Sequence, residues 1–169
     1  ATVVFKGVPL FHTPWLSFSL NNKRKSGLLA PTFGTSSKSG IEFTLPYYWD
    51  IAPNMDATIS PRLMSKRGLQ LNTEYRYLSH DYSGQARVEW LPNDRLMDRN
   101  RYGYSILHNH LTPWNGFTGQ LNISGVSDGT YLRDLSTRIT QASQGNLLRQ
   151  GILTYGAWWG SAAVNLQTY

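Results

Sequence analysis

Polar and apolar residues alternate along most of the chain. Over residues 41–51 every odd position is apolar or aromatic, and the even positions are mostly polar. The odd positions are Ile41, Phe43, Leu45, Tyr47, Trp49 and Ile51. Successive side chains of an extended strand point to opposite faces, so this pattern predicts a β-strand with one apolar face. Its length fits the roughly 9–11 residues of a tilted membrane-crossing strand better than the roughly 5–6 of a typical strand.

The same alternation returns in further segments down to the end of the chain. These segments cover residues 57–63, 69–77, 85–90, 102–111, 117–124, 147–155 and 161–169. Short connections rich in Gly, Pro, Asn and Asp join them, and these residues favour turns. Residues 125–145 form a longer polar loop, and no helix of any length is predicted. The chain is therefore predicted to be all-β, an antiparallel up-and-down meander of about eight strands.

The segment before residue 41 differs from the meander. Short apolar stretches at 3–5 and 8–20, the second broken by prolines, predict short strands of another unit. Residues 21–40 contain a basic cluster and a run rich in Ser, Thr and Gly, which is typical of a linker. The expected organisation is therefore a unit over 1–20, a linker over 21–40 and the meander over 41–169.

Composition narrows the functional classes. Aromatic residues make up 13% of the chain and charged residues 15%, against roughly 25% charged residues in an average soluble domain. This composition suits a surface that faces something other than water. The absence of cysteine excludes a disulfide framework. The net charge is +6, but the basic clusters fall in predicted turns and do not alternate with stacking aromatics, so no nucleic acid is expected as a partner.

No pattern of catalytic residues stands out. The sequence lacks both the Gly-x-Ser-x-Gly nucleophile motif and a glycine-rich loop that would cradle a phosphate. His108 and His110 share one face of a predicted strand, but no third metal ligand can be assigned to them. We therefore predict no enzyme activity, no cofactor and no metal site.

Alternation alone leaves the environment of the meander open. A soluble antiparallel sheet also has one apolar face, which packs on a core. Long strands, charges on the polar face and aromatic residues near strand ends favour a membrane β-barrel. The residues predicted to face its water-filled lumen are Glu42, Asp50, Glu74, Arg76, Arg87 and Glu89. On the pattern, a passive porin-like outer-membrane channel and a soluble carbohydrate-binding β-sandwich remain alternatives.

Longer runs of the sequence resemble one family. Residues 7–18, Gly-Val-Pro-Leu-Phe-His-Thr-Pro-Trp-Leu-Ser-Phe, and 24–28, Arg-Lys-Ser-Gly-Leu, resemble the end of the periplasmic domain of LptD proteins and the linker into their barrel. Residues 45–61, Leu-Pro-Tyr-Tyr-Trp-Asp-Ile-Ala-Pro-Asn-Met-Asp-Ala-Thr-Ile-Ser-Pro, resemble the first barrel hairpin of that family. The specific likeness covers residues 5–95.

This resemblance implies a role in lipopolysaccharide transport. LptD proteins receive lipopolysaccharide from an LptA-like periplasmic bridge, pass its sugar through the barrel lumen and insert it into the outer leaflet of the outer membrane of Gram-negative bacteria. An LptE-like lipoprotein plugs the barrel, and the barrel-assembly machinery acts during folding. Residues 1–20 would then end a periplasmic β-jelly-roll. Residues 41–169 would be the N-terminal strands of a large, here incomplete transmembrane β-barrel in contact with outer-membrane lipid.

The resemblance also implies roles for particular residues. Pro46 and Pro61 match prolines at the lateral gate of the family, where the first and last barrel strands meet. Proline cannot donate a hydrogen bond to the ladder, so two prolines in adjacent strands weaken strand pairing. The six lumen-facing residues would meet phosphate and sugar groups. The path of acyl chains out of the jelly-roll would be lined by Phe5, Phe11, Trp15 and Phe18.

Overall fold

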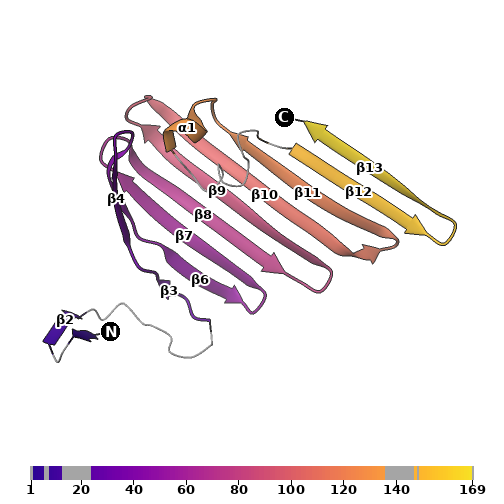
Figure 1. The fold of residues 1–169 in the computed structure, drawn as a ribbon, viewed down its shortest axis with the longest axis horizontal. Coiled ribbons are helices and arrows are strands. Elements are labelled where there is room, and N and C mark those ends of the chain that lie inside the picture. The colour runs from indigo at the N-terminus through magenta and orange to yellow at the C-terminus, as the bar shows by residue number, and fades with distance from the viewer. Residues whose placement is uncertain (1, 6–7, 13–23, 136–146, 148, 169) are drawn as a thin grey trace.

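Most of the chain forms one curved antiparallel sheet (Figure 1). The computed structural model describes residues 2–5, 8–12, 24–135, 147 and 149–168. The strands of the sheet are β3 (Gly27–Leu28), β4 (Thr32–Ser36), β5 (Gly40–Thr44), β6 (Tyr47–Ala52), β7 (Met55–Met64), β8 (Gly68–Leu78), β9 (Tyr82–Asp94), β10 (Arg99–Trp114), β11 (Phe117–Val126), β12 (Arg149–Ala157) and β13 (Gly160–Thr168). Two further strands, β1 (Thr2–Phe5) and β2 (Val8–His12), pair with each other in a separate hairpin. The predicted all-β antiparallel fold is confirmed.

The strands from β7 to β13 lie side by side in the order of the sequence. Each pairs with its neighbour in antiparallel register, as in an up-and-down meander. Short turns join most neighbours, and only β11 and β12 are joined by a long connection. The meander predicted from the alternation is therefore present, and its strand rhythm matches the predicted segments.

A single strand in two pieces begins the predicted meander. Thr44 of β5 pairs with Arg62, and Tyr47 of β6 pairs with Ile59, so β5 and β6 keep one register against β7. The ladder is interrupted between them, at Leu45 and Pro46. Proline has no N–H to donate, which accounts for the break at this point. With β5 and β6 counted together, the segments after residue 40 correspond to the eight predicted strands.

The sheet begins earlier than the alternation indicates. Residues 21–40 were expected to be a linker, but β3 and β4 lie within this range. Thr32 of β4 pairs with Thr44, and Leu28 of β3 pairs with Tyr47, so both short strands extend the sheet beyond β5 and β6. Phe33 is the only large apolar residue among the five of β4, so its sequence shows no alternation to reveal the strand.

The connection between β11 and β12 contains a short helix, α1 (Tyr131–Leu135), which corrects the prediction that no helix of any length is present. The carboxylate of Asp128 starts this turn, because it accepts hydrogen bonds from the Thr130 amide at 3.1 Å and from the Thr130 hydroxyl at 2.7 Å. Among the described residues, no helix has the length and apolar character needed to cross a membrane.

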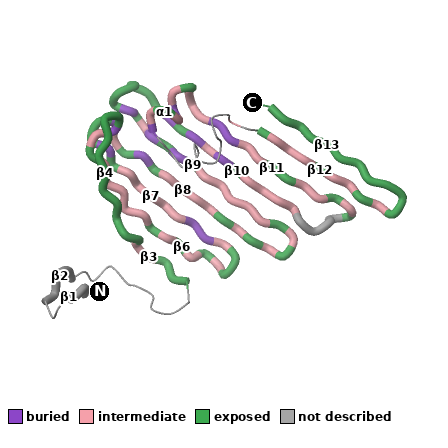
Figure 2. The backbone as a smooth tube through the Cα atoms, viewed as in Figure 1, coloured by how far each residue is buried: buried purple, intermediate pink, exposed green. Residues whose placement is uncertain are grey.

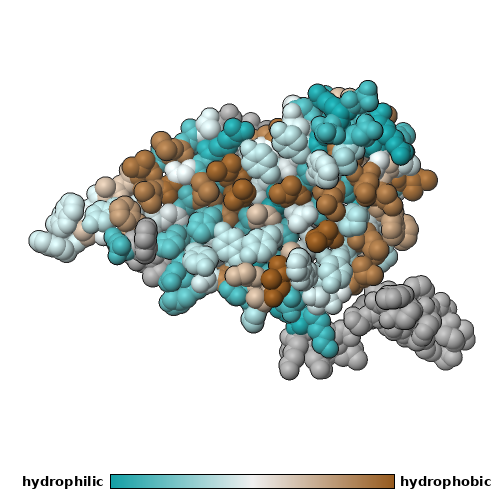
Figure 3. Space-filling model, turned by 180° about the vertical axis from the view of Figure 1, so that it is seen from behind, coloured by the Kyte–Doolittle hydropathy of each residue, from teal (hydrophilic) through white to brown (hydrophobic). Residues whose placement is uncertain are grey.

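The distribution of burial is inverted relative to that of a water-soluble domain (Figure 2). The fully buried side chains include charged and amide groups, such as Arg101, Asp94 and Gln70. Large apolar side chains are instead exposed along the strands, and Val88 and Trp90 each retain 49% exposure. Figure 3 shows apolar side chains spread over the sheet as seen from behind. In the described part of the chain, no second layer covers this apolar face.

Candidate functional site

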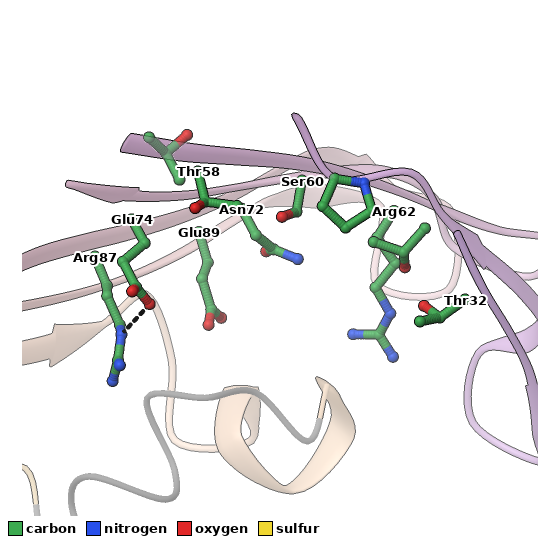
Figure 4. A pocket seen from close by; sticks show the side chains of 11 residues that line it. Thr32, Thr58, Ser60, Arg62, Asn72, Glu74, Arg87 and Glu89 are labelled. Carbon is green, nitrogen blue, oxygen red and sulfur yellow. Dashed lines mark hydrogen bonds and ion pairs between the residues drawn. The ribbon is translucent and has the colours of Figure 1, made fainter. Parts of the chain in front are cut away.

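A polar pocket lies on the other face of the sheet, between the first strands and α1. Its volume is about 250 Å³. The lining residues are Thr32, Thr44, Pro46, Thr58, Ser60, Arg62, Asn72, Thr73, Glu74, Arg87 and Glu89. Figure 4 shows their side chains extending from the strands toward the helix. The pocket thus offers hydroxyl, amide, carboxylate and guanidinium groups on one surface.

Strand register explains why these side chains gather. Residues directly opposite each other in an antiparallel ladder share a face. Thr58 pairs with Glu74, and Glu74 pairs with Arg87, which gives one polar row across three strands. Ser60, Asn72 and Glu89 form the next row in the same way. The Oδ1 atom of Asn72 is buried without a hydrogen-bond partner, so the pocket wall holds one unsatisfied acceptor.

Ion pairs fix the charged side chains of the polar face. Arg87 donates from Nε to Oε2 of Glu74 at 2.9 Å. Arg62 donates from Nη2 to Oε2 of Glu42 at 2.6 Å, and it also reaches the side-chain oxygen of Gln70 at 3.2 Å. These groups are partly buried, so their pairing is screened less than that of exposed charges.

Arg62 also connects the sheet to the helix. Its Nη1 donates to the carbonyl of Leu135 at 3.1 Å, at the end of α1. One guanidinium therefore bridges β5, through Glu42, to β7, β8 and the helix. This makes Arg62 the residue that holds the first strand and α1 in a fixed relation.

Replacing Arg62 with leucine is expected to loosen β5. Glu42 would lose its charge partner, and a partly buried charged group without its partner costs about 1–3 kcal/mol. Hydrogen exchange of the β5 amides in the full-length protein should speed up accordingly. Lys66→Ala is the matched control, because Lys66 at the same end of β7 makes an exposed contact to the Ser37 carbonyl. Equal exchange in both variants would contradict the bridging role of Arg62.

The polar residues predicted from the alternation share this face of the sheet. Glu74, Arg87 and Glu89 line the pocket, and Glu42 lies beside it through Arg62. Asp50 and Arg76 lie on the same face nearer the β6–β7 turn, because both are in register with Asp56. The sequence therefore assigned these six residues to one face, and the structure divides them between the pocket and a second cluster.

Asp56 is the centre of that second cluster and was missed from the sequence. It is 2% exposed and accepts hydrogen bonds from Arg76 at 2.7 Å, from Arg24 at 2.6 Å and from the Tyr48 hydroxyl at 3.2 Å. The predicted strand began at residue 57, so Asp56 lay just outside it. The alternation is a usable signal, since Asp56 continues the polar face of β7.

A buried charge network anchors the connection that carries α1. The guanidinium of Arg101 is completely buried. Its Nη1 donates to Asp94 and to Asp134, each at 3.1 Å, and its Nε and Nη2 donate to the two carboxylate oxygens of Asp128 at 3.0 Å. Arg67 adds a second guanidinium against Asp94. The network joins the β7–β8 and β9–β10 turns to the residues that flank and form α1.

The network keeps Asp128 and Asp134 ionised. Burial opposes the charged form of Asp128, but hydrogen bonds from Thr130, Arg101 and Ser127 outweigh it and hold the pKa of Asp128 far below its usual range. Asp134 has a lowered pKa for the same kinds of reason, with Thr130 and Arg101 as its main hydrogen-bond donors. The anchor of α1 therefore stays charged across the physiological pH range.

Tyr131 fixes the helix over the pocket wall. Its hydroxyl donates to Oε2 of Glu89 at 2.9 Å and accepts from Nε2 of Gln70 at 3.2 Å. Burial, and then the nearby Glu89 carboxylate, raise the pKa of Tyr131 well above its usual range, so the hydroxyl remains a donor. The helix is thus held against the polar face by specific contacts, one of them with the pocket residue Glu89.

The two prolines lie at the interruption of the first strand. The Pro61 carbonyl accepts from the Leu45 amide at 3.2 Å, and the Pro46 carbonyl accepts from the Leu29 amide at 2.8 Å. The N and O atoms of one strand residue point to the same neighbour, so the missing N–H of Pro61 faces Leu45. Each proline removes a hydrogen bond beside the pocket, which Pro46 also lines.

The residues expected to form an acyl-chain path are not placed by the structure. Phe5 lies in β1 and Phe11 in β2, but the structure describes only the backbone of these two strands. Trp15 and Phe18 lie outside the described residues. Their proposed role stays a prediction from the resemblance.

Comparisons with known proteins agree on one family. A family model described as LptD protein matches residues 1–156. LPS-assembly protein LptD of Azoarcus sp. (strain BH72) is 50% identical over 169 residues, which cover 99% of this chain and 21% of that protein. LPS-assembly protein LptD of Ralstonia nicotianae is 49% identical over 162 residues, which cover 95% of this chain and 20% of that protein. The chain therefore spans about a fifth of the length of the curated relatives it matches.

Proposed function

The chain belongs to the LptD protein family, and on that premise we propose that it forms part of an outer-membrane β-barrel that transports lipopolysaccharide and inserts it into the outer leaflet. The observation that carries this proposal is the inverted distribution of burial. Apolar side chains are exposed on one face of the sheet, while ion pairs and polar groups gather on the other. A sheet with this pattern is suited to lipid on one side and a wet lumen on the other.

The exposed apolar face supports lipid contact over a soluble sandwich. Monomeric soluble proteins rarely expose apolar patches beyond a few hundred Å². Here apolar residues such as Trp49, Val88 and Leu166 are all about half exposed or more. A carbohydrate-binding sandwich would cover this face with a second sheet, and none covers it in the described part of the chain. The proposed site of action is thus the outer membrane of a Gram-negative bacterium.

The polar face supports passage of a charged sugar. Arg62 and Arg87 present guanidinium groups, which bind phosphate well, and the Thr and Ser hydroxyls of the pocket match sugar hydroxyls. In this proposal, Glu42, Asp50, Glu74, Arg76, Arg87 and Glu89 belong to the lumen wall. Their role is to contact and guide lipopolysaccharide, without any chemical step.

The interrupted first strand supports a lateral gate at Pro46 and Pro61. The N–H missing at Pro61 weakens the pairing of the first strand with β7, and the N–H missing at Pro46 weakens its pairing on the β3 side. A weak ladder near the end of the sheet is a place where strands separate at low cost. We place the opening through which lipid reaches the membrane beside this interruption.

The proposal requires strands and partners beyond this chain. The sheet has open edges at β13 and at β3 and β4, and unpaired backbone groups are costly in lipid. Further strands of the full-length protein would pair with these edges, after insertion by the barrel-assembly machinery. An LptE-like lipoprotein would fill the lumen, and an LptA-like bridge would deliver lipopolysaccharide through the N-terminal unit, past Phe5, Phe11, Trp15 and Phe18.

Replacing both Pro46 and Pro61 with alanine in the full-length protein is expected to reduce lipopolysaccharide transport several-fold. Each alanine restores an N–H, and the one at residue 61 faces Leu45. A net gain of about 1 kcal/mol per restored bond disfavours the open ladder about fivefold. Delivery of newly made lipopolysaccharide to the cell surface is the measurement.

Pro92→Ala is the control for this experiment. Pro92 lies on β9 where the β9–β10 register shifts, away from the first strand. Its replacement should leave transport unchanged. Normal transport in the Pro46→Ala/Pro61→Ala double variant would refute the gate.

A further inference from the structure

A groove crosses the apolar face where β10, β11, β12 and β13 meet. Its volume is about 480 Å³, within the roughly 300–1,000 Å³ of small-ligand sites. The floor contains Gly119 and Gly151, and the walls are aliphatic. These walls include Leu121, Leu153, Val164 and Leu166. This groove lies on the side of the sheet opposite the polar pocket, so the transport path does not use it.

The local structure gives no reason for glycine at the two floor positions, Gly119 and Gly151. Leu121 opposes Gly151, and Leu153 opposes Gly119, in a register without any shift. Neither glycine has a positive φ. A Cβ on Gly119 would lie 3.7 Å from the nearest atom, and one on Gly151 would lie 3.9 Å from Leu121, which is ordinary contact. The backbone of the sheet would therefore accept a Cβ at both positions.

Two other strand glycines of the same sheet, Gly84 and Gly125, do have such a reason. A Cβ on Gly84 would collide with the ring of Tyr77, and one on Gly125 would collide with the ring of Tyr104. These glycines make room for a tyrosine of the neighbouring strand. A glycine within a strand costs about 0.5–1 kcal/mol, and where no bulge or bend explains it, it often marks the close approach of a ligand.

One wall of the groove carries polar atoms among aromatic rings. His108 and His110 line it, and Nδ1 of His108 lies 2.6 Å from the Tyr77 hydroxyl. The ring of Tyr82 stacks on His110 at an interplanar angle of 10°. Amphipathic aromatic side chains of this kind gather at the headgroup level of membranes. The groove therefore suits a ligand that has an apolar chain and a polar head, with the head on the side of His108 and Tyr77.

We propose that this groove holds one acyl chain of a membrane phospholipid as a bound lipid, distinct from the lipid that exchanges freely around the protein. This inference rests on the membrane placement of the proposed function. The groove occupies the half of β11 next to the Asn115–Gly116 turn, opposite the long β11–β12 connection. Barrels have short turns on the periplasmic side and long loops outside, which assigns the groove to the periplasmic leaflet. Its occupant is therefore phospholipid rather than the lipopolysaccharide of the outer leaflet.

The experiment uses the full-length protein in vesicles of phosphatidylethanolamine and phosphatidylglycerol, with a phosphatidylethanolamine that carries a photoreactive acyl chain. After illumination, labelled peptides are mapped. We expect labelling of residues 119–121 and 151–153 to exceed that around Val88, an equally lipid-exposed site, several-fold. Even labelling over the apolar face would overturn the proposal, and so would preferential labelling by lipopolysaccharide carrying the same reactive group.

A groove-filling variant makes the test specific. Gly119→Val/Gly151→Val should lower the labelling of the groove to the level at Val88. Gly156→Val is the control, because a Cβ at Gly156 meets no atom within 4 Å and the residue faces the other side of β12. Undiminished labelling of the filled groove would also overturn the proposal. Neither result bears on lipopolysaccharide delivery, so loss of the groove and loss of the transport function are separable.

Discussion

Replacing Arg101 with leucine is expected to release α1 from the polar face and to destabilise the protein by about 3–5 kcal/mol, the cost of removing one partner from a buried ion pair. Arg101 is fully buried and donates to three carboxylates, of Asp94, Asp128 and Asp134. Without it, the Asp94 carboxylate keeps the ion pair with Arg67 and the hydrogen bond from the Leu96 amide, but loses its second guanidinium. Unfolding of the full-length protein in urea gives the free energy, and hydrogen exchange over residues 127–135 reports the release of α1.

Arg99→Leu is the matched control for this change. Arg99 lies two residues away on the same strand and pairs with the same Asp128 at 3.3 Å, but its side chain is 47% exposed. Exposed ion pairs contribute only about 0–1 kcal/mol. A loss for Arg101→Leu no greater than that for Arg99→Leu would contradict the anchoring role of the buried network.

Replacing Val88 with arginine is expected to cost about 2–4 kcal/mol in a bilayer, because an arginine on the lipid face near the membrane midplane loses its hydration. Val88 lies in the middle of β9 with 49% of its surface exposed. In water, the same substitution at an exposed position would change stability by no more than about 0.5 kcal/mol. The size of the effect therefore distinguishes lipid from water on this face.

The measurement is reversible folding of the full-length protein into phospholipid bilayers, followed by urea titration. Gln85→Arg on the same strand is the control, since residue 85 points to the opposite, polar face. It should be nearly neutral. A loss below about 0.5 kcal/mol for Val88→Arg would show that the apolar face does not contact lipid hydrocarbon.

The strands were predictable because each one has an apolar face and a polar face. Period-two alternation reports that asymmetry directly, so the segments from 57–63 to 161–169 were found from the sequence. β4 was missed because Phe33 is its only large apolar residue, so it shows no alternation, and β3 because two residues are too short to show a period. α1 was missed for a different reason: its contacts come from residues distant in the sequence, such as Glu89 and Arg101.

The candidate site was predictable in part. The alternation of side chains along each strand placed Glu74, Arg87 and Glu89 on one face, because strand geometry alone determines to which face a residue points. It did not reveal that α1 contacts this face through Tyr131, or that Asp94 and Asp128 pair with Arg101. Those two aspartates fall in connections, where no periodicity relates them to a strand.

The central claim is that one face of the sheet contacts lipid and the other contacts water. Single cysteines along β8 test it most directly, because this segment contains no native cysteine. In vesicles of the full-length protein, cysteine at Asn72 or Glu74 should react with a charged, water-soluble maleimide. Cysteine at Leu71 or Tyr75 should resist it and should crosslink to a photoreactive acyl chain. Equal maleimide reactivity at odd and even positions would contradict the account.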